Sequence, residues 1–152
     1  MKILFVCYAN ACRSQMAEAY ARFRAPDGVE IQSAGMIAAG VWPQAREAMA
    51  GWEIHLDGQT SKRLDDLADR DFDLVISLSE KARKACDARF PEAERLHWPI
   101  LDPAGVRGSA DEVREVFALT RQDLAEEIDA LFEERFGAAR LGPRPARSDP
   151  QS

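Results

Sequence analysis

The feature that most constrains this chain is an apolar strand that runs directly into a cysteine-containing loop and a helix start. Residues 3–7 are all apolar and include the β-branched Ile3 and Val6, which is typical of a strand buried on both faces in a parallel sheet. A loop over residues 8–12 follows, and Arg13 begins a helical pattern. The sequence therefore predicts a thiol, that of Cys7, at a strand end and an arginine at the next helix N-terminus.

This arrangement suits a tetrahedral oxyanion. A loop that leads into a helix N-terminus directs several unpaired backbone N–H groups into one concavity. The same amides and the helix dipole favour the thiolate form of Cys7. Arg13 can donate two parallel hydrogen bonds to a phosphate-like group, and Ser14 can donate one to the sulfur. Asn10 tolerates the left-handed backbone that a tight loop needs. The candidate substrate-binding residues are Tyr8, Ala9, Asn10, Ala11, Cys12, Arg13 and Ser14. The alternative is an ordinary strand-to-helix turn that contains a buried cysteine.

Composition limits the classes of function. The 152 residues, 46% hydrophobic and 30% charged, fit one globular domain. A net charge of −6 argues against nonspecific nucleic-acid binding. We expect no membrane association, because no apolar run approaches spanning length and no signal peptide precedes the strand. Three cysteines suggest a reducing cytoplasm rather than a disulfide scaffold. Two histidines without ligand spacing predict no metal site, and we expect no cofactor.

Strands and helices alternate along the chain. Strands are predicted over residues 29–33, 72–78 and 95–98, and helices over residues 44–50, 60–67, 80–89 and 109–136. This alternation predicts an α/β fold, a three-layer sandwich with a central four-stranded parallel sheet, over residues 1–137. Residues 138–152, which contain three prolines, are predicted to be a disordered tail. Because ligands bind at the carboxyl ends of parallel strands, residues 101–105 are a candidate second wall of the site.

These motifs together resemble the low-molecular-weight protein tyrosine phosphatases, and even more their relatives, the phosphatase-fold arsenate reductases. The resemblance is carried by residues 6–18, 33–35, 59–62, 73–75 and 98–103, and covers roughly residues 1–136. It implies that Cys7 attacks phosphorus while Arg13 and the loop amides hold the oxygens. It also implies that Asp102 protonates the leaving oxygen and then activates water. From the residues alone, Asp102 can equally be the start of an Asp-Pro turn.

Two departures from the family pattern affect the site. Ala9 stands where the family usually has glycine, so we expect the loop to adopt a glycine-like conformation with a Cβ present. Ser14 is followed by Gln15 rather than proline, and no tyrosines follow Asp102 and Pro103. The second departure is the choice that arsenate reductases make, and it leaves the slot for an aryl group less evident.

The positions of the cysteines argue against arsenate reduction by the usual route. Reductases of this fold use a three-thiol relay, and the two later relay positions correspond here to Ser79 and Cys86. Because a serine cannot form a disulfide, reduction would need a shortened Cys7–Cys86 exchange, or thioredoxin or a low-molecular-weight thiol. Cys86 can alternatively be a small buried helix residue. Cys12 can guard Cys7 against overoxidation, as in phosphatases of the family, or face the core.

Some reductases of the family also hold a potassium ion. Asn10, Glu18 and Ser33 match three of its ligands, but Lys62 replaces the fourth, an aspartate. We therefore expect the Lys62 ammonium to take the place of the ion.

Three functions remain, in this order. The first is phosphomonoester hydrolysis of the tyrosine phosphatase type, because Cys7, Arg13 and Asp102 complete the hydrolytic set. The second is arsenate reduction at the same loop, and the third is an inactive oxyanion-binding module. The expected ligand is a phosphate-, phosphotyrosine- or arsenate-like oxyanion.

Overall fold

The structure is a computed structural model that describes residues 1–146. Strands and α-helices alternate along this range: β1 (Lys2–Cys7), α1 (Arg13–Arg24), β2 (Glu30–Gly35), α2 (Pro43–Ala50), β3 (Leu74–Ser77), α3 (Glu80–Arg89), β4 (Glu94–His97) and α4 (Ala110–Phe136). Three short 3-10 turns complete it: η1 (Leu64–Asp66), η2 (Pro103–Gly105) and η3 (Ala138–Arg140). No helix within residues 1–146 combines the length and the apolar character that crossing a bilayer requires.

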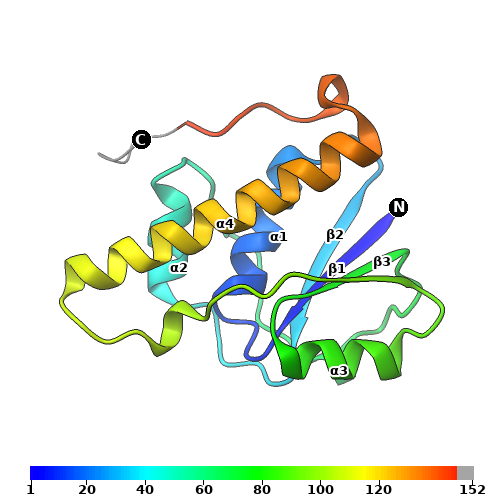
Figure 1. Ribbon diagram of the computed structural model, residues 1–152, viewed down its shortest axis with the longest axis horizontal. Coiled ribbons are helices and arrows are strands. Elements are labelled where there is room, and N and C mark those ends of the chain that lie inside the picture. Colours follow the sequence, from blue (N-terminus) through cyan, green and yellow to red (C-terminus); the bar gives the residue numbers. More distant parts are fainter. Residues whose placement is uncertain (147–152) are drawn as a thin grey trace.

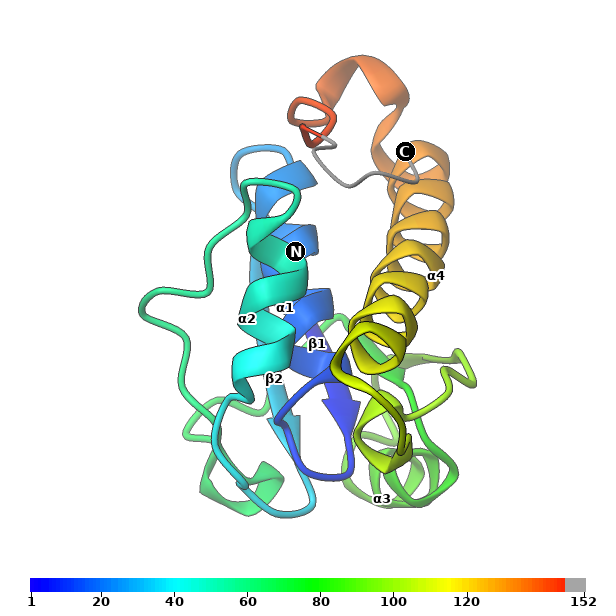
Figure 2. The ribbon, with the colours of Figure 1, turned by 90° about the vertical axis from the view of Figure 1, so that its left-hand side faces the viewer.

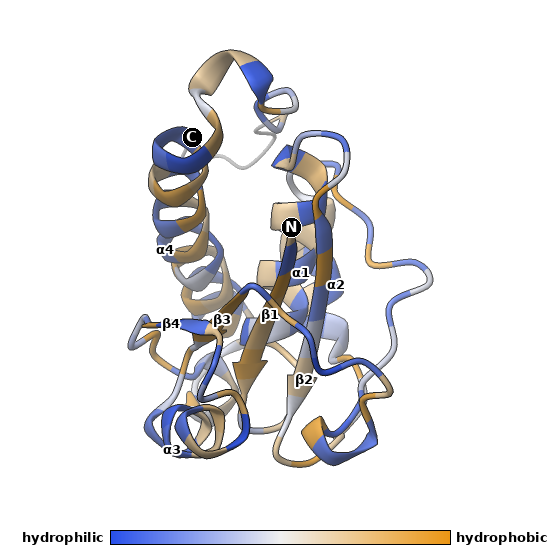
Figure 3. Ribbon diagram, turned by 90° about the vertical axis from the view of Figure 1, so that its right-hand side faces the viewer, coloured by the Kyte–Doolittle hydropathy of each residue, from blue (hydrophilic) through white to orange (hydrophobic). Residues whose placement is uncertain are grey.

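The strands form one parallel sheet in the order β2-β1-β3-β4, which confirms the predicted fold class. Helices α1, α2 and α4 cover one face and α3 covers the other (Figures 1 and 2). Central strand β1 alternates between the two cores: Ile3 and Phe5 face the α1 side, and Leu4 and Val6 face α3. Figure 3 shows apolar residues concentrated in β1, whereas α4 alternates between apolar and polar positions. Burial on both faces explains why β1 reads as a continuous apolar run.

Local signals place two of the helix starts. The Ser79 side chain accepts a hydrogen bond from the Ala82 amide at the start of α3, 3.3 Å away. Ser109 and Glu112 form the predicted capping box of α4. The predicted helix over residues 60–67 is wrong, because only η1 forms there. Ser61 does not cap it, since its hydroxyl donates to the Asn10 carbonyl oxygen at 2.8 Å instead.

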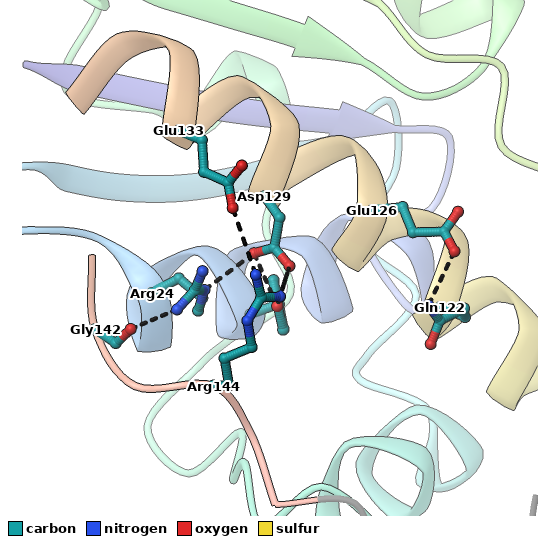
Figure 4. Close-up of polar contacts among 8 residues, drawn as sticks. Arg24, Gln122, Glu126, Asp129, Glu133, Gly142 and Arg144 are labelled. Carbon is teal, nitrogen blue, oxygen red and sulfur yellow. Dashed lines mark hydrogen bonds and ion pairs between the residues drawn. The ribbon is translucent and has the colours of Figure 1, made fainter. Parts of the chain in front are cut away.

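The predicted disorder of residues 138–152 does not describe the segment 138–146, which returns along the ends of α1 and α4 (Figure 1). Gly142 donates its amide proton to the Arg24 carbonyl at 2.8 Å. Arg144 pairs with Asp129 at 3.3 Å and with Glu133 at 3.5 Å (Figure 4). The proline-rich composition of this segment suggested disorder. The carboxylates that hold it lie on α4, so the composition of the segment alone could not reveal them. The predicted disorder of residues 147–152 lies outside the described residues.

Candidate active site

The candidate site lies where β1 ends and α1 begins. Cys7 is the last residue of β1 and Arg13 is the first of α1, as the sequence predicts. The Cys7 sulfur lies 2.8 Å from the Ser14 hydroxyl, so this hydroxyl can stabilise a thiolate by donating a hydrogen bond. Only 2% of the Cys7 surface is exposed, because the loop over residues 8–12 wraps around the thiol.

The carbonyls of residues 8–11 point outward to the surrounding chain. Tyr8 O accepts from the Met36 and Ile37 amides (2.7 and 3.0 Å), Ala9 O from the Ala39 amide (3.0 Å), Asn10 O from the Ser61 hydroxyl (2.8 Å), and Ala11 O from the Trp42 amide (3.1 Å). In a trans peptide unit the N–H points opposite to the carbonyl. The N–H groups of residues 9–12 therefore turn to the inner side of the loop, where they form a concavity suited to an anion.

Asn10 holds this loop in shape. Its backbone is left-handed, with φ of 48°, and its side chain is completely buried. The side-chain amide donates to the Ser14 and Ser33 hydroxyls at 2.7 and 3.0 Å. Its oxygen accepts from Gln15 Nε2 at 2.9 Å and from the Lys62 amide at 2.8 Å. The left-handed backbone follows from the residue type, whereas the two bonds that its oxygen accepts depend on distant partners and were not predicted from the sequence.

The expected glycine-like conformation at Ala9 is wrong. Within residues 1–146, the non-glycine residues with positive φ are Asn10 and Glu53. The left-handed residue of the loop is Asn10, a residue type that tolerates this backbone, as the sequence predicts. The Cβ of Ala9 therefore causes no backbone strain in the loop.

Gly35 is a site residue that sequence reasoning did not assign to the loop packing. It lies opposite Cys7 in the register between β1 and β2. A Cβ at Gly35 would lie 2.5 Å from the Ile37 carbonyl oxygen, 2.6 Å from the Asn10 nitrogen and 2.9 Å from the Ala9 carbonyl carbon. Only glycine allows the loop backbone to approach β2 this closely. A glycine at a strand end was the available signal, but the close approach depends on the tertiary fold.

Arg13 connects the loop to two later segments. Its Nη1 donates to the Leu78 carbonyl at 3.2 Å and to the Ile100 carbonyl at 3.1 Å. Its Nη2 lies 3.4 Å from Asp102 Oδ2, and the other oxygen of Asp102 accepts from the Ala104 amide at 3.0 Å. Arg13 is 7% exposed, whereas the Asp102 side chain is 49% exposed. The structure thus brings Arg13 and Asp102 together beside the loop that contains Cys7, with the carboxylate on the solvent side.

The other two thiols are buried. Cys12 lies at the start of α1, and burial raises its pKa to about 12, with smaller contributions from Asp102 and Cys7. Cys86 packs on α3 against the sheet face that carries Leu4, and burial raises its pKa to about 12 as well. Cys7 belongs to the core on the opposite face of the sheet. The structure therefore brings Cys12 near Cys7 but does not bring Cys86 there.

The Lys62 ammonium does not occupy the expected ion position. It donates to the Thr60 carbonyl at 3.3 Å on the surface. Glu18 instead accepts from the Ser33 hydroxyl at 2.6 Å and pairs with Arg22 at 2.6 Å. The charge that neutralises the buried carboxylate thus comes from the next turn of the same helix, a pairing at spacing i, i+4 that the sequence contains but that was not considered.

Exposed apolar side chains lie on the loops that carry or contact the site residues. Tyr8, Ile37 and Leu101 are 39%, 45% and 73% exposed, and they come from three separate loops at the carboxyl end of the sheet. Ile37 lies next to Tyr8 through their backbone hydrogen bond, and Leu101 precedes Asp102. The Lys81 ammonium, from α3, lies over the Tyr8 ring, 5.1 Å from its centroid. Tyr8 is one of the predicted substrate-binding residues, but Ile37, Leu101 and Lys81 were not predicted, because their positions depend on how separate loops meet in space.

Known proteins share this architecture. A family model described as low molecular weight phosphotyrosine protein phosphatase matches residues 2–136. The arsenate reductase of Halalkalibacterium halodurans is 37% identical over 131 residues, which cover 86% of this chain and 94% of that protein.

Solved structures agree with the sequence comparison. The YwlE arginine phosphatase of Geobacillus stearothermophilus superposes with a TM-score of 0.75 at 28% identity and covers 88% of this chain and 92% of its own. An arsenate reductase in its phosphate-binding state superposes with a TM-score of 0.70 at 29% identity, over 88% of this chain and 97% of its own. The chain belongs to the low molecular weight phosphotyrosine protein phosphatase family, and arsenate reductases are among its relatives.

Proposed function

We propose that the protein hydrolyses phosphomonoesters through a phosphocysteine intermediate at Cys7. The observation that carries the proposal is the loop geometry, in which outward carbonyls turn consecutive N–H groups to one side around the thiol. Such preorganised donors stabilise the equatorial oxygens of a phosphoryl group in the transition state without reorganisation. The dianion also gains from the Arg13 guanidinium, whose position is already fixed by two carbonyl groups.

The reaction needs two steps at one phosphorus atom. The Cys7 thiolate attacks phosphorus, the ester P–O bond breaks, and Asp102 donates its proton to the leaving alcohol oxygen. The resulting Asp102 carboxylate then removes a proton from a water molecule, which attacks phosphorus and breaks the S–P bond. Inorganic phosphate forms, and the Cys7 thiolate and the Asp102 acid are regenerated. The half-exposed carboxylate beside Arg13 supports this role, because the leaving group departs on the solvent side.

Arsenate reduction is a second candidate, and similarity to arsenate reductases favours it. Here Cys7 attacks arsenic, and water leaves. Release of arsenite then needs two electrons, supplied as two thiols become one disulfide. Ser79 offers no thiol, and Cys86 is buried on the other face of the sheet. We therefore propose that any reduction draws its electrons from an external thiol, either thioredoxin or a low-molecular-weight thiol. Without either activity, the site would be an oxyanion-binding module.

The experiment compares two substrates of different leaving-group reactivity. Phenyl phosphate and 4-nitrophenyl phosphate are assayed with the full chain and with Cys7→Ser, Asp102→Asn and Asp123→Asn, the last being an exposed control on α4. We expect Cys7→Ser to abolish turnover and Asp123→Asn to leave it unchanged. Asp102→Asn should lower kcat/KM, which reports the step in which the leaving group departs, by about 10²–10⁴-fold for phenyl phosphate, and by less for the nitrophenyl ester, whose oxygen leaves without protonation.

A parallel assay supplies arsenate with thioredoxin, glutathione or mycothiol. Arsenate reduction that depends on Cys7, with no hydrolysis of either ester, would replace the first function by the second. Phosphate binding without either turnover would support the binding module. Equal losses of kcat/KM for both esters in Asp102→Asn would show that this residue is not the acid.

A further inference from the structure

We propose that Lys81 is a specificity-determining residue that selects phosphomonoesters with a second negative charge on the leaving group. The proposal rests on the proposed hydrolase function, which defines where the leaving group departs. Its basis is the position of the Lys81 ammonium over the Tyr8 ring, 5.1 Å from the ring centroid. This contact fixes a cation at the rim of the anion-binding loop.

The backbone that carries the ring beneath Lys81 is held in place. Tyr8 follows Cys7 directly, and its carbonyl accepts hydrogen bonds from two amides, those of Met36 and Ile37. Tyr8 is 39% exposed, and the Lys81 ammonium lies over its ring. An exposed lysine normally loses considerable rotamer entropy when it binds a ligand, and a stacking partner reduces that loss.

The helix that carries Lys81 is also tied to the site. Arg13 donates to the carbonyl of Leu78, the residue that follows β3. Ser79 then caps α3, and Lys81 is the second residue of that helix. The base of the lysine therefore lies three residues from a carbonyl that orients the candidate phosphate-binding arginine.

The direction of departure brings a leaving group toward this cation. In an in-line displacement the attacking and leaving atoms lie on opposite sides of phosphorus. Cys7 attacks from the buried floor of the loop, so the leaving group points to solvent across the rim that Tyr8 forms. A carboxylate or second phosphate on that group would meet the Lys81 ammonium.

Neighbouring carboxylates have other partners. Glu80 lies 3.8 Å from Arg83 and 3.7 Å from the His97 ring nitrogen, and Asp102 pairs with Arg13 at 3.4 Å. The chain as a whole carries a net charge of −6, which repels anionic substrates at long range. The Lys81 ammonium at the rim thus attracts an anionic leaving group locally, whereas the net negative charge of the chain repels it.

The test compares phenyl phosphate with 4-carboxyphenyl phosphate in the unmodified protein, Lys81→Gln and Lys84→Gln. Lys84 is an exposed lysine one turn further along α3, so its variant removes the same charge away from the rim. The measured quantity is the ratio of kcat/KM for the two esters. Each protein is compared on the same pair of substrates, so their intrinsic reactivities cancel between variants.

We expect Lys81→Gln to lower this ratio by about two- to five-fold, as for an exposed ion pair, and Lys84→Gln to leave it unchanged. The effect should shrink as ionic strength rises. Inhibition by inorganic phosphate, which has no leaving group, should change equally in both variants. An unchanged ratio in Lys81→Gln, or equal losses in the two variants, would overturn the proposal.

Binding measurements distinguish a failure of the hydrolase function from a failure of the proposal on Lys81. Benzylphosphonate and (4-carboxybenzyl)phosphonate cannot turn over, and their dissociation constants give the same ratio in an inactive protein. A carboxylate preference that Lys81→Gln removes would support the rim cation even if no ester is hydrolysed. Binding of both phosphonates without such a preference would refute it.

Discussion

Replacement of Asn10 tests whether one side chain holds the anion-binding loop together. Asn10→Ala removes an amide that makes four hydrogen bonds, to the hydroxyls of Ser14 and Ser33 and from Gln15 and the Lys62 backbone. It also leaves a Cβ-bearing residue at φ of 48° without a side chain that can bond locally. Asn10→Gly removes the same bonds but accepts the left-handed backbone without steric cost.

The expected magnitudes follow from these contacts. A net value of about 1 kcal/mol for each hydrogen bond gives a loss of about 4 kcal/mol in the free energy of unfolding for either variant. The left-handed backbone adds about 1 kcal/mol to the cost of alanine. Asn10→Ala should therefore be destabilised by about 5 kcal/mol, close to the full stability of a small domain. Asn10→Gly should retain about 1 kcal/mol more.

Urea unfolding followed by tryptophan fluorescence measures both differences. Gln122→Ala is a matched control, because it removes a partly exposed amide that donates to the surface residue Glu126, at 2.9 Å (Figure 4). We expect the control to change stability by less than about 0.5 kcal/mol. A loss for Asn10→Ala no larger than that of the control would refute the reasoning. Equal losses of stability in the alanine and glycine variants would refute the cost assigned to the left-handed backbone, but not the contribution of the hydrogen bonds.

Three further predictions concern other parts of the molecule. Gly35→Ala should lower phosphate affinity by more than about tenfold, measured by calorimetry, because its Cβ would displace the Asn10 nitrogen that lies 2.6 Å away. Gly142→Ala should detach residues 141–146, because the added Cβ would lie 2.4 Å from the Phe23 carbonyl oxygen, and trypsin should then cleave this segment faster. The control is Gly105→Ala, which should leave the cleavage rate unchanged because its Cβ meets nothing within 4 Å. The pKa of both Cys12 and Cys86 is raised from 9.0 to about 12, so the stability that their burial contributes should be present below pH 9 and lost between pH 9 and about 12. Urea midpoints should fall across this range, and by less in Cys86→Ala; a flat profile would contradict the burial argument.

Features that depend on neighbouring residues could be predicted from the sequence. The apolar run before Cys7, the helix start at Arg13 and the capping box at Ser109 are all short-range signals, and each lies where it was expected. Their order along the chain was enough to predict the parallel sheet. A local pattern reflects the burial and hydrogen bonding of its own segment. These interactions determine where β1 ends and therefore place Cys7 at that end.

Features that depend on contacts between distant segments could not be predicted in this way. The docking of residues 138–146 depends on Asp129 and Glu133 of α4, and the close approach at Gly35 depends on where the loop folds over β2. The helix expected over residues 60–67 does not form, because Ser61 bonds to the loop rather than to its own segment. In each case a long-range partner competes with the local preference and prevails.

The carbonyl groups that orient Arg13 also determine when the site can form. They belong to Leu78 and Ile100, which lie 65 and 87 residues further along the chain. Because distant contacts form only after long loops close, the thiol emerges early in synthesis while its arginine stays unanchored until β3 and the segment after β4 have assembled. Anion affinity therefore develops at the end of folding. A nascent or partly folded chain therefore presents Cys7 without an oriented Arg13 beside it.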